Sequence, residues 1–276
     1  MPKIIARRRL VPNLHLIEVE APETARAARP GQFVILMADE HGERIPLSIA
    51  DWDADKGTVT SVFLVIGSAT QKLARLGAGD NLPVYVGPLG RPSEITAFGT
   101  VVLAAGCYGL GALWPTARAL RAAGNRMITI IDTKASYLLY WDDRYRMVSD
   151  RSLFSSRDPG LSGGEFVSGK IGEILKTEKI DRVIAVGCTS LMRAVAEATR
   201  PAGIRTIVSL NPIMVDGTGM CGSCRCTAAG KTKFACVDGP DFDGHQVDWD
   251  ELFRRRKSYF DEEIQSLCRW ERENLP

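Results

Sequence analysis

The chain has 276 residues, of which 45% are hydrophobic and 25% charged, and its formal net charge is +2 at pH 7. This length suits two globular domains, and the near-balanced charge argues against a nucleic-acid-binding protein. No apolar run reaches the roughly 18 residues of a membrane helix, and the start "MPKIIARRRL" lacks the apolar core of a signal peptide, so we expect a cytoplasmic protein.

Residues 1–95 have the pattern of a small antiparallel β-barrel. Apolar and polar residues alternate over 13–22, a short apolar run covers 32–38, and 57–67 is rich in Val and Thr. We expect one helix in this part, near "TQKLARL", and a tight turn at "GPLGRP" that closes the domain. We interpret the basic run at 7–9, like a second one at 254–257, as a solvated face.

From residue 96 the pattern changes to strands that alternate with helices. "GTVVLAAG", "RMITIID" and "IDRVIAVG" are buried strands, whereas "WPTARALRAAG" and "SLMRAVAEATR" are helices, the first ending at Gly124. Such alternation predicts a parallel sheet with helical crossovers over 96–208. "FSSRDPGLSGGEF" at 154–166 reads as a loop, and 248–270 as one closing amphipathic helix.

The stretch "RIPLSIAD" offers an arginine, a proline and a serine at alternate positions of a barrel strand. Arg44 supplies a guanidinium for a phosphate, and Pro46 removes a backbone donor at an edge where a flat ring can stack. Farther on, Gly67 to Thr70 open a helix whose free amides and Thr70 hydroxyl can hold a pyrophosphate. The plainer interpretation of the first motif is an edge strand with an exposed arginine.

Residues 216–240, "DGTGMCGSCRCTAAGKTKFACVDGP", hold four of the seven cysteines. In a cytoplasmic protein this clustering indicates metal or redox chemistry. A plant-type iron–sulfur site needs C-x4-C-x2-C and a remote cysteine, but Asp216 stands where the first cysteine should be. The segment 211–245 has few large apolar residues and needs a ligand as its core.

Three interpretations of these cysteines remain open. A carboxylate oxygen can ligate iron, which would make Asp216 a ligand together with Cys221, Cys224 and Cys236. A four-thiolate cluster would use Cys226 instead; against it, we expect Cys224 and Cys226 to point to opposite faces of a strand that runs into "RCTAA". The third interpretation is a structural or zinc site. We expect Cys268, on the closing helix, to be a core residue.

Taken together, these motifs resemble the ferredoxin–NADP reductase superfamily over nearly the whole chain. R-x-P-x-S, G-x-x-T before a helix, a G-P-L-G turn and a terminal cysteine lobe carry the likeness. The chain is most similar to the small iron–sulfur flavoprotein subunit of NADH-dependent reduced ferredoxin:NADP oxidoreductase, also described as a sulfide dehydrogenase subunit. The electron-transfer subunit of dihydroorotate dehydrogenase is a more distant cousin, and "MVDGTGMCGSCR" and "KFACVDGP" are the most specific pieces.

The resemblance implies two cofactor sites. Arg44 would contact an FAD phosphate, Ser48 would lie near flavin N5, and Gly67 to Thr70 would hold the pyrophosphate. In the closer family the first cluster cysteine is an aspartate, which favours a [2Fe–2S] cluster on Asp216 and three cysteines, with Gly217, Gly219 and Gly222 letting amides approach the sulfides. The FAD residues expected on this basis are Arg44, Pro46, Leu47, Ser48, Val65, Gly67, Ala69, Thr70, Gly87 and Leu89.

The nucleotide loop departs from the family pattern G-G-G-x-G-I-A-P. In "AGCYGLGA" Gly106 and Gly109 remain, while Cys107 replaces a glycine and Ala112 a proline, and Cys188 stands where a proline follows a later strand. We favour two small buried apolar positions for the two cysteines over a functional pair. An acid at Asp132, after a strand, can accept from a ribose 2′-hydroxyl and would repel a 2′-phosphate, which favours NAD(H) over NADP(H).

The sequence therefore predicts three parts: an FAD barrel at 1–95, a NAD(H)-binding domain at 96–208, and a [2Fe–2S] lobe with a closing helix at 209–276. Hydride would pass between nicotinamide and flavin, and single electrons would leave through the cluster. The resemblance implies a larger partner subunit that carries FAD and [4Fe–4S] clusters and binds NADP(H). Ferredoxin would exchange electrons with this chain only indirectly. Flavin-based electron bifurcation is compatible with such a complex. Two alternatives are a subunit of another reductase, such as a hydrogenase or a dihydroorotate dehydrogenase, and an electron relay without nucleotide binding.

Overall fold

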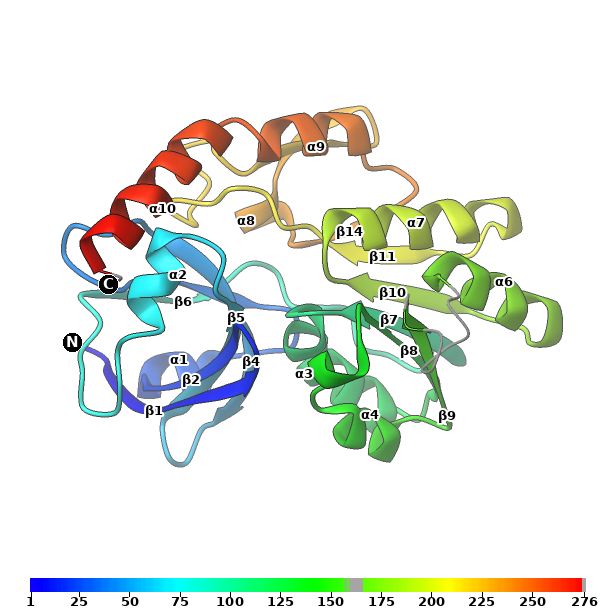
Figure 1. Ribbon diagram of the computed structural model, residues 1–276. Helices are drawn as coiled ribbons and strands as arrows, with labels where there is room; N and C mark the ends of the chain where they lie inside the picture. The colour runs from blue at the N-terminus through cyan, green and yellow to red at the C-terminus, as the bar shows by residue number, and fades with distance from the viewer. Residues whose placement is uncertain (157, 159–165, 275–276) are drawn as a thin grey trace.

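The computed structural model describes residues 1–156, 158 and 166–274. Figure 1 shows a barrel that contains the N-terminus, a sheet with helices on both faces beside it, and a C-terminal lobe whose helices run back over the barrel. None of the helices in this described part is long and apolar enough to cross a bilayer.

The barrel is a six-stranded antiparallel sheet in the order β1-β2-β5-β4-β3-β6, as predicted. A bridge between Lys3 and Asn81 joins its first strand to the segment before its last. Two helices accompany the strands where one was predicted, and the last strand continues through "GPL", so the turn begins only at Gly90. The elements are β1 (Lys3–Val11), β2 (Leu14–Glu20), α1 (Pro22–Ala27), β3 (Phe33–Met37), β4 (Ile45–Asp53), β5 (Thr58–Leu64), α2 (Ser68–Leu73) and β6 (Val84–Leu89).

Strand β4 changes neighbours halfway along its length. Residues 45–48 pair with β3, whereas 49–53 pair with β5. The first half therefore leaves one backbone edge unpaired, and Pro46, which has no N–H to offer, lies in that half. This confirms the predicted edge at "RIPLS".

The second sheet has the order β14-β11-β10-β7-β8-β9, and all its strands are parallel except β14. The predicted strand–helix alternation is confirmed, but β9, β11, α4 and α6 were not predicted, and α3 begins before the predicted helix. The predicted loop at 154–166 is wrong at its start, where β9 includes 154–156, and residues 157 and 159–165 lie outside the described part. The elements are β7 (Thr100–Gly106), α3 (Gly109–Ala122), β8 (Arg126–Thr133), η1 (Ser136–Leu138), α4 (Asp142–Val148), β9 (Arg151–Ser156), α6 (Val167–Thr177), β10 (Arg182–Val186), α7 (Thr189–Thr199), η2 (Arg200–Ala202) and β11 (Thr206–Ser209).

Alternate residues of each strand face two separate cores. Val101 and Leu103 of β7 lie in the core beneath α3 and α4, where Trp114 meets Tyr145 edge-on with ring centroids 5.6 Å apart. Val102 and Ala104 lie in the opposite core, beneath α6 and α7. The barrel joins the first of these cores through residues of β2, β4 and β5, so α3 lies between barrel and sheet.

The C-terminal lobe is less independent than the sequence indicated. Its strand β14 pairs with β11 of the parallel sheet, and the closing helix is two helices broken at 257–259. The lobe's elements are β12 (Arg225–Ala228), β13 (Lys231–Phe234), α8 (Ala235–Asp238), β14 (Asp241–Asp243), α9 (Trp249–Arg256) and α10 (Phe260–Asn274).

The last helix packs on the barrel, as Figure 1 shows for α10 and α2. The hydroxyls of Ser68 and Ser266 are 2.8 Å apart, and the Arg75 guanidinium lies 4.4 Å from the centre of the Trp270 ring. Cys268 on this helix is exposed, so the prediction of a core residue is wrong. It lies on the opposite side from the one buried residue of this helix, Trp270.

Glycine at position 109 is required by packing rather than by backbone conformation. A Cβ there would lie 2.1 Å from the Val186 carbonyl oxygen, because α3 starts directly against the end of β10. Gly109→Ala should therefore destabilise the chain by about 1–3 kcal/mol, as overpacking does. Gly172→Ala is the matched control: position 172 lies inside α6 with nothing within 4 Å of the new Cβ, and alanine there should stabilise by about 0.5–1 kcal/mol. Urea unfolding of the two variants checks this, and equal free energies would contradict it.

Candidate functional site

The loop that carries the cysteines is built on three glycines in the left-handed region. Gly217, Gly219 and Gly222 have φ values of 76°, 84° and 70°, which glycine adopts without strain. A Cβ on Gly217 would lie 2.6 Å from Leu89 of the barrel. There is therefore no room for a side chain at position 217, and this part of the loop packs directly on β6.

Asp216 and Cys221 form one pair of candidate cluster ligands in this loop. The Asp216 carboxylate accepts the backbone N–H of Thr218 at 2.9 Å and that of Cys221 at 2.8 Å. These hydrogen bonds, the Thr218 bond first, lower the pKa of Asp216. The carboxylate is thus charged and held beside Cys221, as either a ligand or a turn residue would be.

Cys224 and Cys236 form the second pair, with their Sγ atoms 3.1 Å apart. Both are buried, and burial, followed by the contact with Cys224, raises the pKa of Cys236 to about 12. In the described part of the chain no three His, Cys, Asp or Glu side chains are arranged to hold a single metal ion. A two-iron cluster needs two protein ligands on each iron instead, and two pairs are what the loop presents.

Cys226 lies in the same core as Cys224, which corrects the sequence argument about these two residues. They do not point to opposite faces: Cys224 is 2% exposed and Cys226 1%. Residues two apart in a strand share a face, so the prediction was wrong on its own geometry. Burial raises the pKa of Cys226 to about 12, and its backbone pairs with Lys233 in the β12–β13 hairpin.

In the second basic run Arg254, Arg256 and Lys257 are exposed, as predicted, whereas Arg255 is half-buried and binds backbone carbonyls of this lobe. Arg255 donates from Nε to the Arg225 carbonyl at 2.9 Å and from Nη2 to the Ser223 carbonyl at 3.2 Å. The run at 7–9 is exposed, as predicted.

The predicted flavin residues lie on or beside β4, β6 and the start of α2. Arg44 is exposed just before β4, Ser48 is opposite Phe33 in the β3–β4 pair, and Leu89 ends β6. A Cβ on Gly87 would lie 2.6 Å from Val34, so glycine is needed where β6 crosses β3. Leu47 is buried in the barrel core, whereas Pro46 is only half-buried at the open edge of β4.

Helix α2 begins at the predicted place, and Thr70 caps it. The Thr70 hydroxyl accepts the N–H of Ile66 at 3.0 Å and that of Gly67 at 3.1 Å. Its oxygen therefore satisfies two amides at the helix start. Val65 and Ala69 are half-buried here, and nothing lies within 4 Å of a Cβ built on Gly67, which leaves room at this turn.

The predicted nucleotide residues meet at the carboxyl edge of the parallel sheet, where open α/β sheets bind ligands. Gly106 ends β7 and pairs with Asp132 of β8, and a Cβ on Gly106 would lie 2.9 Å from the Asp132 carbonyl oxygen. The Asp132 carboxylate accepts the Ser155 hydroxyl at 2.8 Å. Cys107 and Cys188 are exposed here, so the favoured interpretation of both as buried residues is wrong.

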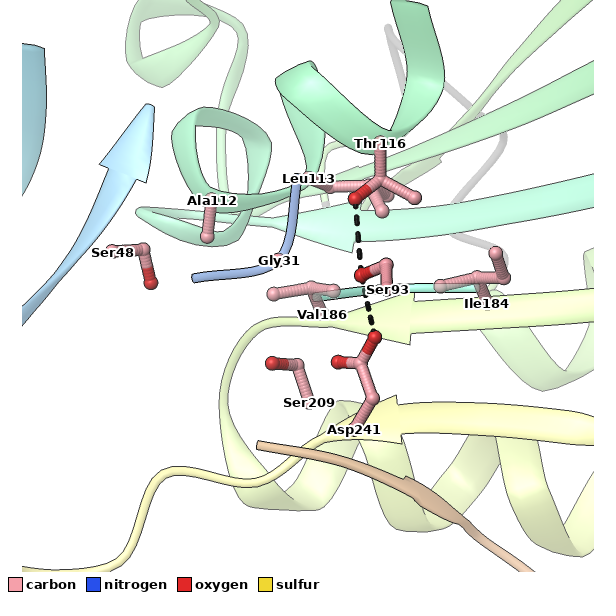
Figure 2. A pocket seen from close by; sticks show the side chains of 10 residues that line it. All are labelled: Gly31, Ser48, Ser93, Ala112, Leu113, Thr116, Ile184, Val186, Ser209 and Asp241. Atoms are coloured by element: carbon pink, nitrogen blue, oxygen red, sulfur yellow. Dashed lines mark hydrogen bonds between the residues drawn. The ribbon is translucent and has the colours of Figure 1, made fainter. Parts of the chain in front are cut away.

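A small cavity where barrel, sheet and lobe meet was not predicted. Figure 2 shows Thr116 donating to Ser93 at 3.3 Å and Ser93 donating to Asp241 at 2.6 Å, with Ser48 on the barrel side. Burial is the first cause of a raised pKa at Asp241, partly offset by hydrogen bonds from Ser93 and Ser209. These polar residues come from α3, a connecting segment, β11 and β14, so no local sequence pattern joins them.

Comparison with known proteins agrees with this arrangement. Residues 211–248 match the iron–sulfur cluster binding domain of dihydroorotate dehydrogenase B. The chain is 40% identical, over 95% of its length and 92% of the relative's, to the dihydroorotate dehydrogenase B (NAD(+)) electron transfer subunit homolog of Thermotoga maritima.

Two solved structures extend the comparison. A chain of the NADH-dependent reduced ferredoxin–NADP oxidoreductase, a structure that addresses flavin-based electron bifurcation, superposes with a TM-score of 0.92 at 38% identity over 98% of both chains. A ferredoxin–NADP+ reductase from Neisseria gonorrhoeae, with FAD and NADP bound, has a TM-score of 0.61 at 16% identity over 73% of this chain and 90% of its own. The second likeness concerns the fold alone.

The raised pKa of the buried Asp241 carboxyl predicts how the stability of the fold depends on pH. Because folding raises its pKa, the stability that its protonated form contributes is complete below the ordinary value of about 3.9 and is lost as the pH rises through the raised value. Asparagine does not ionise, so the melting temperature of Asp241→Asn relative to the unmodified chain should rise between pH 4 and pH 8. Thermal unfolding across this range measures it.

Asp150→Asn serves as a control of opposite sign. The Met127 backbone N–H, more than Arg121, lowers the pKa of Asp150, so its charged form stabilises the fold. The melting temperature of this variant, relative to the unmodified chain, should fall over the same pH range. If the melting temperatures of both variants changed in the same direction with pH, this would contradict the conclusion that the site of Asp241 favours its neutral form.

Proposed function

The chain belongs to the family of dihydroorotate dehydrogenase B electron-transfer subunits, within the ferredoxin–NADP reductase superfamily, and from that premise we propose that it passes electrons from NADH through FAD and a [2Fe–2S] cluster to a larger partner subunit. The observation that carries the proposal is the position of the cluster loop against the barrel. Gly217 rests on Leu89 and Ile35 of the barrel, so a cluster in this loop and a flavin on this side of the barrel are neighbours.

The protein's part is to bind, orient and separate the cofactors. When bound, the flavin exchanges hydride with the nucleotide and single electrons with the cluster. The proposed parts are the barrel at 1–95, the nucleotide domain at 96–208 and the cluster lobe with its helices at 209–276. This organisation supports a route from the sheet edge through the barrel to the lobe.

The flavin residues have distinct roles in this proposal. The exposed Arg44 pairs with an FAD phosphate. The amides of Ser68 and Ala69 at the start of α2 face the pyrophosphate, while Thr70 accepts the amides before them and so holds the turn at Gly67 in shape. Ser48 faces the cavity between barrel and sheet, which is where a hydride would have to arrive. The remaining proposed FAD contacts are Pro46 and Leu47 of β4, together with Val65, Gly87 and Leu89.

For the cluster we propose Asp216 and Cys221 on one iron and Cys224 and Cys236 on the other. The two pairs and the amides of the glycine loop support this set. Cys226 is held instead by the hairpin and by burial. A carboxylate is a harder ligand than a thiolate and would change the cluster potential.

Nucleotide is proposed to bind at Gly106, Cys107, Gly109, Asp132 and Cys188. The Asp132 carboxylate, oriented by Ser155, favours a ribose hydroxyl over a phosphate and hence NADH over NADPH. The alternative, a relay that no longer binds nucleotide, rests on the altered loop.

Members of this family are subunits of larger complexes. We propose that the partner carries FAD and [4Fe–4S] clusters, binds NADP(H) and serves ferredoxin. The Met220 side chain, next to Cys221 in the loop, is 89% exposed, and Val215 and Val237 of the same lobe are exposed as well. These apolar side chains around the loop support a protein surface over the cluster. The match of 211–248 to a dihydroorotate dehydrogenase B domain keeps a dihydroorotate dehydrogenase as the second candidate.

Anaerobic rapid mixing of the purified complex with each nucleotide tests the function. NADH should bleach the flavin absorbance, and an iron–sulfur paramagnetic signal should then appear. NADPH should do so more slowly, because Asp132 repels the extra phosphate. A faster reaction with NADPH would sink the role of Asp132, and no reaction with either would favour the relay.

Variants of Asp216 test the ligand set by paramagnetic resonance. Asp216→Cys should keep a [2Fe–2S] cluster with a changed spectrum, because a softer ligand replaces oxygen on one iron. Asp216→Asn, which keeps an acceptor for the loop amides, should lose cluster, and Cys226→Ala should leave the spectrum unchanged. The reverse pair, with the signal lost in Cys226→Ala and intact in Asp216→Asn, would make Asp216 a turn residue.

A further inference from the structure

Two free cysteines stand side by side at the edge of the parallel sheet. Cys107 directly follows β7 and Cys188 follows β10, and both are exposed. The strands β7 and β10 are neighbours, and their last paired residues are Ala105 and Val186. Cys107 and Cys188 each lie two residues beyond this last pair, in the turns that lead from β7 into α3 and from β10 into α7.

Their separation suits a covalent bond. Neighbouring strands lie about 4.7–4.9 Å apart, and the Cα atoms of disulfide-bonded cysteines lie about 4.4–6.8 Å apart. The intervening glycines confirm that the two segments stay close beyond the strands: a Cβ on Gly187 would lie 3.2 Å from the Gly106 carbonyl oxygen.

Two tyrosines hold the segments in place. The Tyr108 hydroxyl donates to the Gly187 carbonyl at 3.0 Å, and the Tyr140 hydroxyl donates to the Cys107 carbonyl at 2.8 Å. Cys107 is kept at φ 53°, a left-handed conformation that is uncommon for a residue other than glycine. Such local strain persists where the surroundings enforce it and is concentrated at functional sites.

We propose that Cys107 and Cys188 form a reversible disulfide across the mouth of the nucleotide site, with a small-molecule disulfide as the oxidant, and that this bond excludes the nucleotide. The exclusion rests on the proposed NADH site, whereas the bond itself does not. Both sulfurs would turn into the gap between the two strand ends, where a nucleotide would lie against the sheet edge. Reduction would reopen the edge.

The exchange balances with glutathione disulfide. One protein thiolate attacks a glutathione sulfur, the glutathione S–S bond breaks, and one glutathione thiolate leaves. The second protein thiolate attacks the protein sulfur of this mixed disulfide and releases the other glutathione. The two protein sulfurs are oxidised by two electrons, the two glutathione sulfurs are reduced, and the two protons lost by the cysteines go to the leaving thiolates.

The test uses the intact complex with its cluster, treated with glutathione disulfide, quenched with N-ethylmaleimide and analysed by peptide mass spectrometry. A cross-link between the peptides of Cys107 and Cys188 is expected. Cys107→Ser and Cys188→Ser should instead keep one glutathione on the remaining thiol. Cys268→Ser, which removes an exposed thiol on α10, should form the cross-link like the unmodified chain.

Flavin reduction by NADH is then followed before oxidation, after it, and after dithiothreitol. The oxidised protein should react at least about fivefold more slowly, the lower end of ordinary coupling between two sites, and dithiothreitol should restore the rate. Absence of the cross-link overturns the inference, and a cross-link with an unchanged NADH rate overturns the exclusion of nucleotide. Failure of the reduced protein to react with NADH, with the cross-link present, removes the proposed nucleotide site and with it the exclusion, and leaves the disulfide standing.

Discussion

The cluster lobe has no hydrophobic core of its own, and the rest of the arrangement depends on the core it shares. Its buried residues Met214, Cys224 and Cys236 lie in one continuous core with Phe33 and Ile35 of the barrel and with the α6–α7 face of the parallel sheet. A segment with so few apolar residues becomes ordered by burying them against its neighbours. The position of the cysteine loop is therefore set by the barrel and the sheet together.

Two further attachments fix the lobe. Strand β14 extends the parallel sheet through its pairing with β11, and α10 returns to pack Trp270 beneath Arg75 of the barrel. The lobe is thereby tied to the parallel sheet near the middle of its sequence and to the barrel at its C-terminal end. A rigid seat suits electron transfer, because the separation of two redox cofactors then does not depend on the motion of a linker.

The same close packing decides the sheet edge. The starts of α3 and α7 press against the ends of β7 and β10, which leaves space for glycine alone at Gly109. At this crowded edge two of the positions that depart from the family pattern, Cys107 and Cys188, are exposed. The edge proposed for the nucleotide thus carries two thiols.

Much of the fold could be predicted from the sequence, because periodicity and turn residues act locally. The barrel strands and the β–α alternation after residue 96 can be recognised in short stretches. So can the iron–sulfur character of the cysteine segment, since residues 211–248 match a cluster-binding domain. The family likeness added the cofactors and a partner. The short elements β9, β11 and α4 were missed, and so was α6, although Val167, Ile171 and Ile174 give it an apolar face at helical spacing.

What only the tertiary structure decided are the contacts between segments far apart in the chain. Asp241 meets Ser93 and Thr116 because β14 joins a sheet begun more than a hundred residues earlier. Cys226 shares a core with Cys224, and Cys268 faces solvent, for reasons of packing that composition does not contain. Burial and register are properties of the assembled layers, so the pairing of Cys107 with Cys188 follows only once two strands lie side by side.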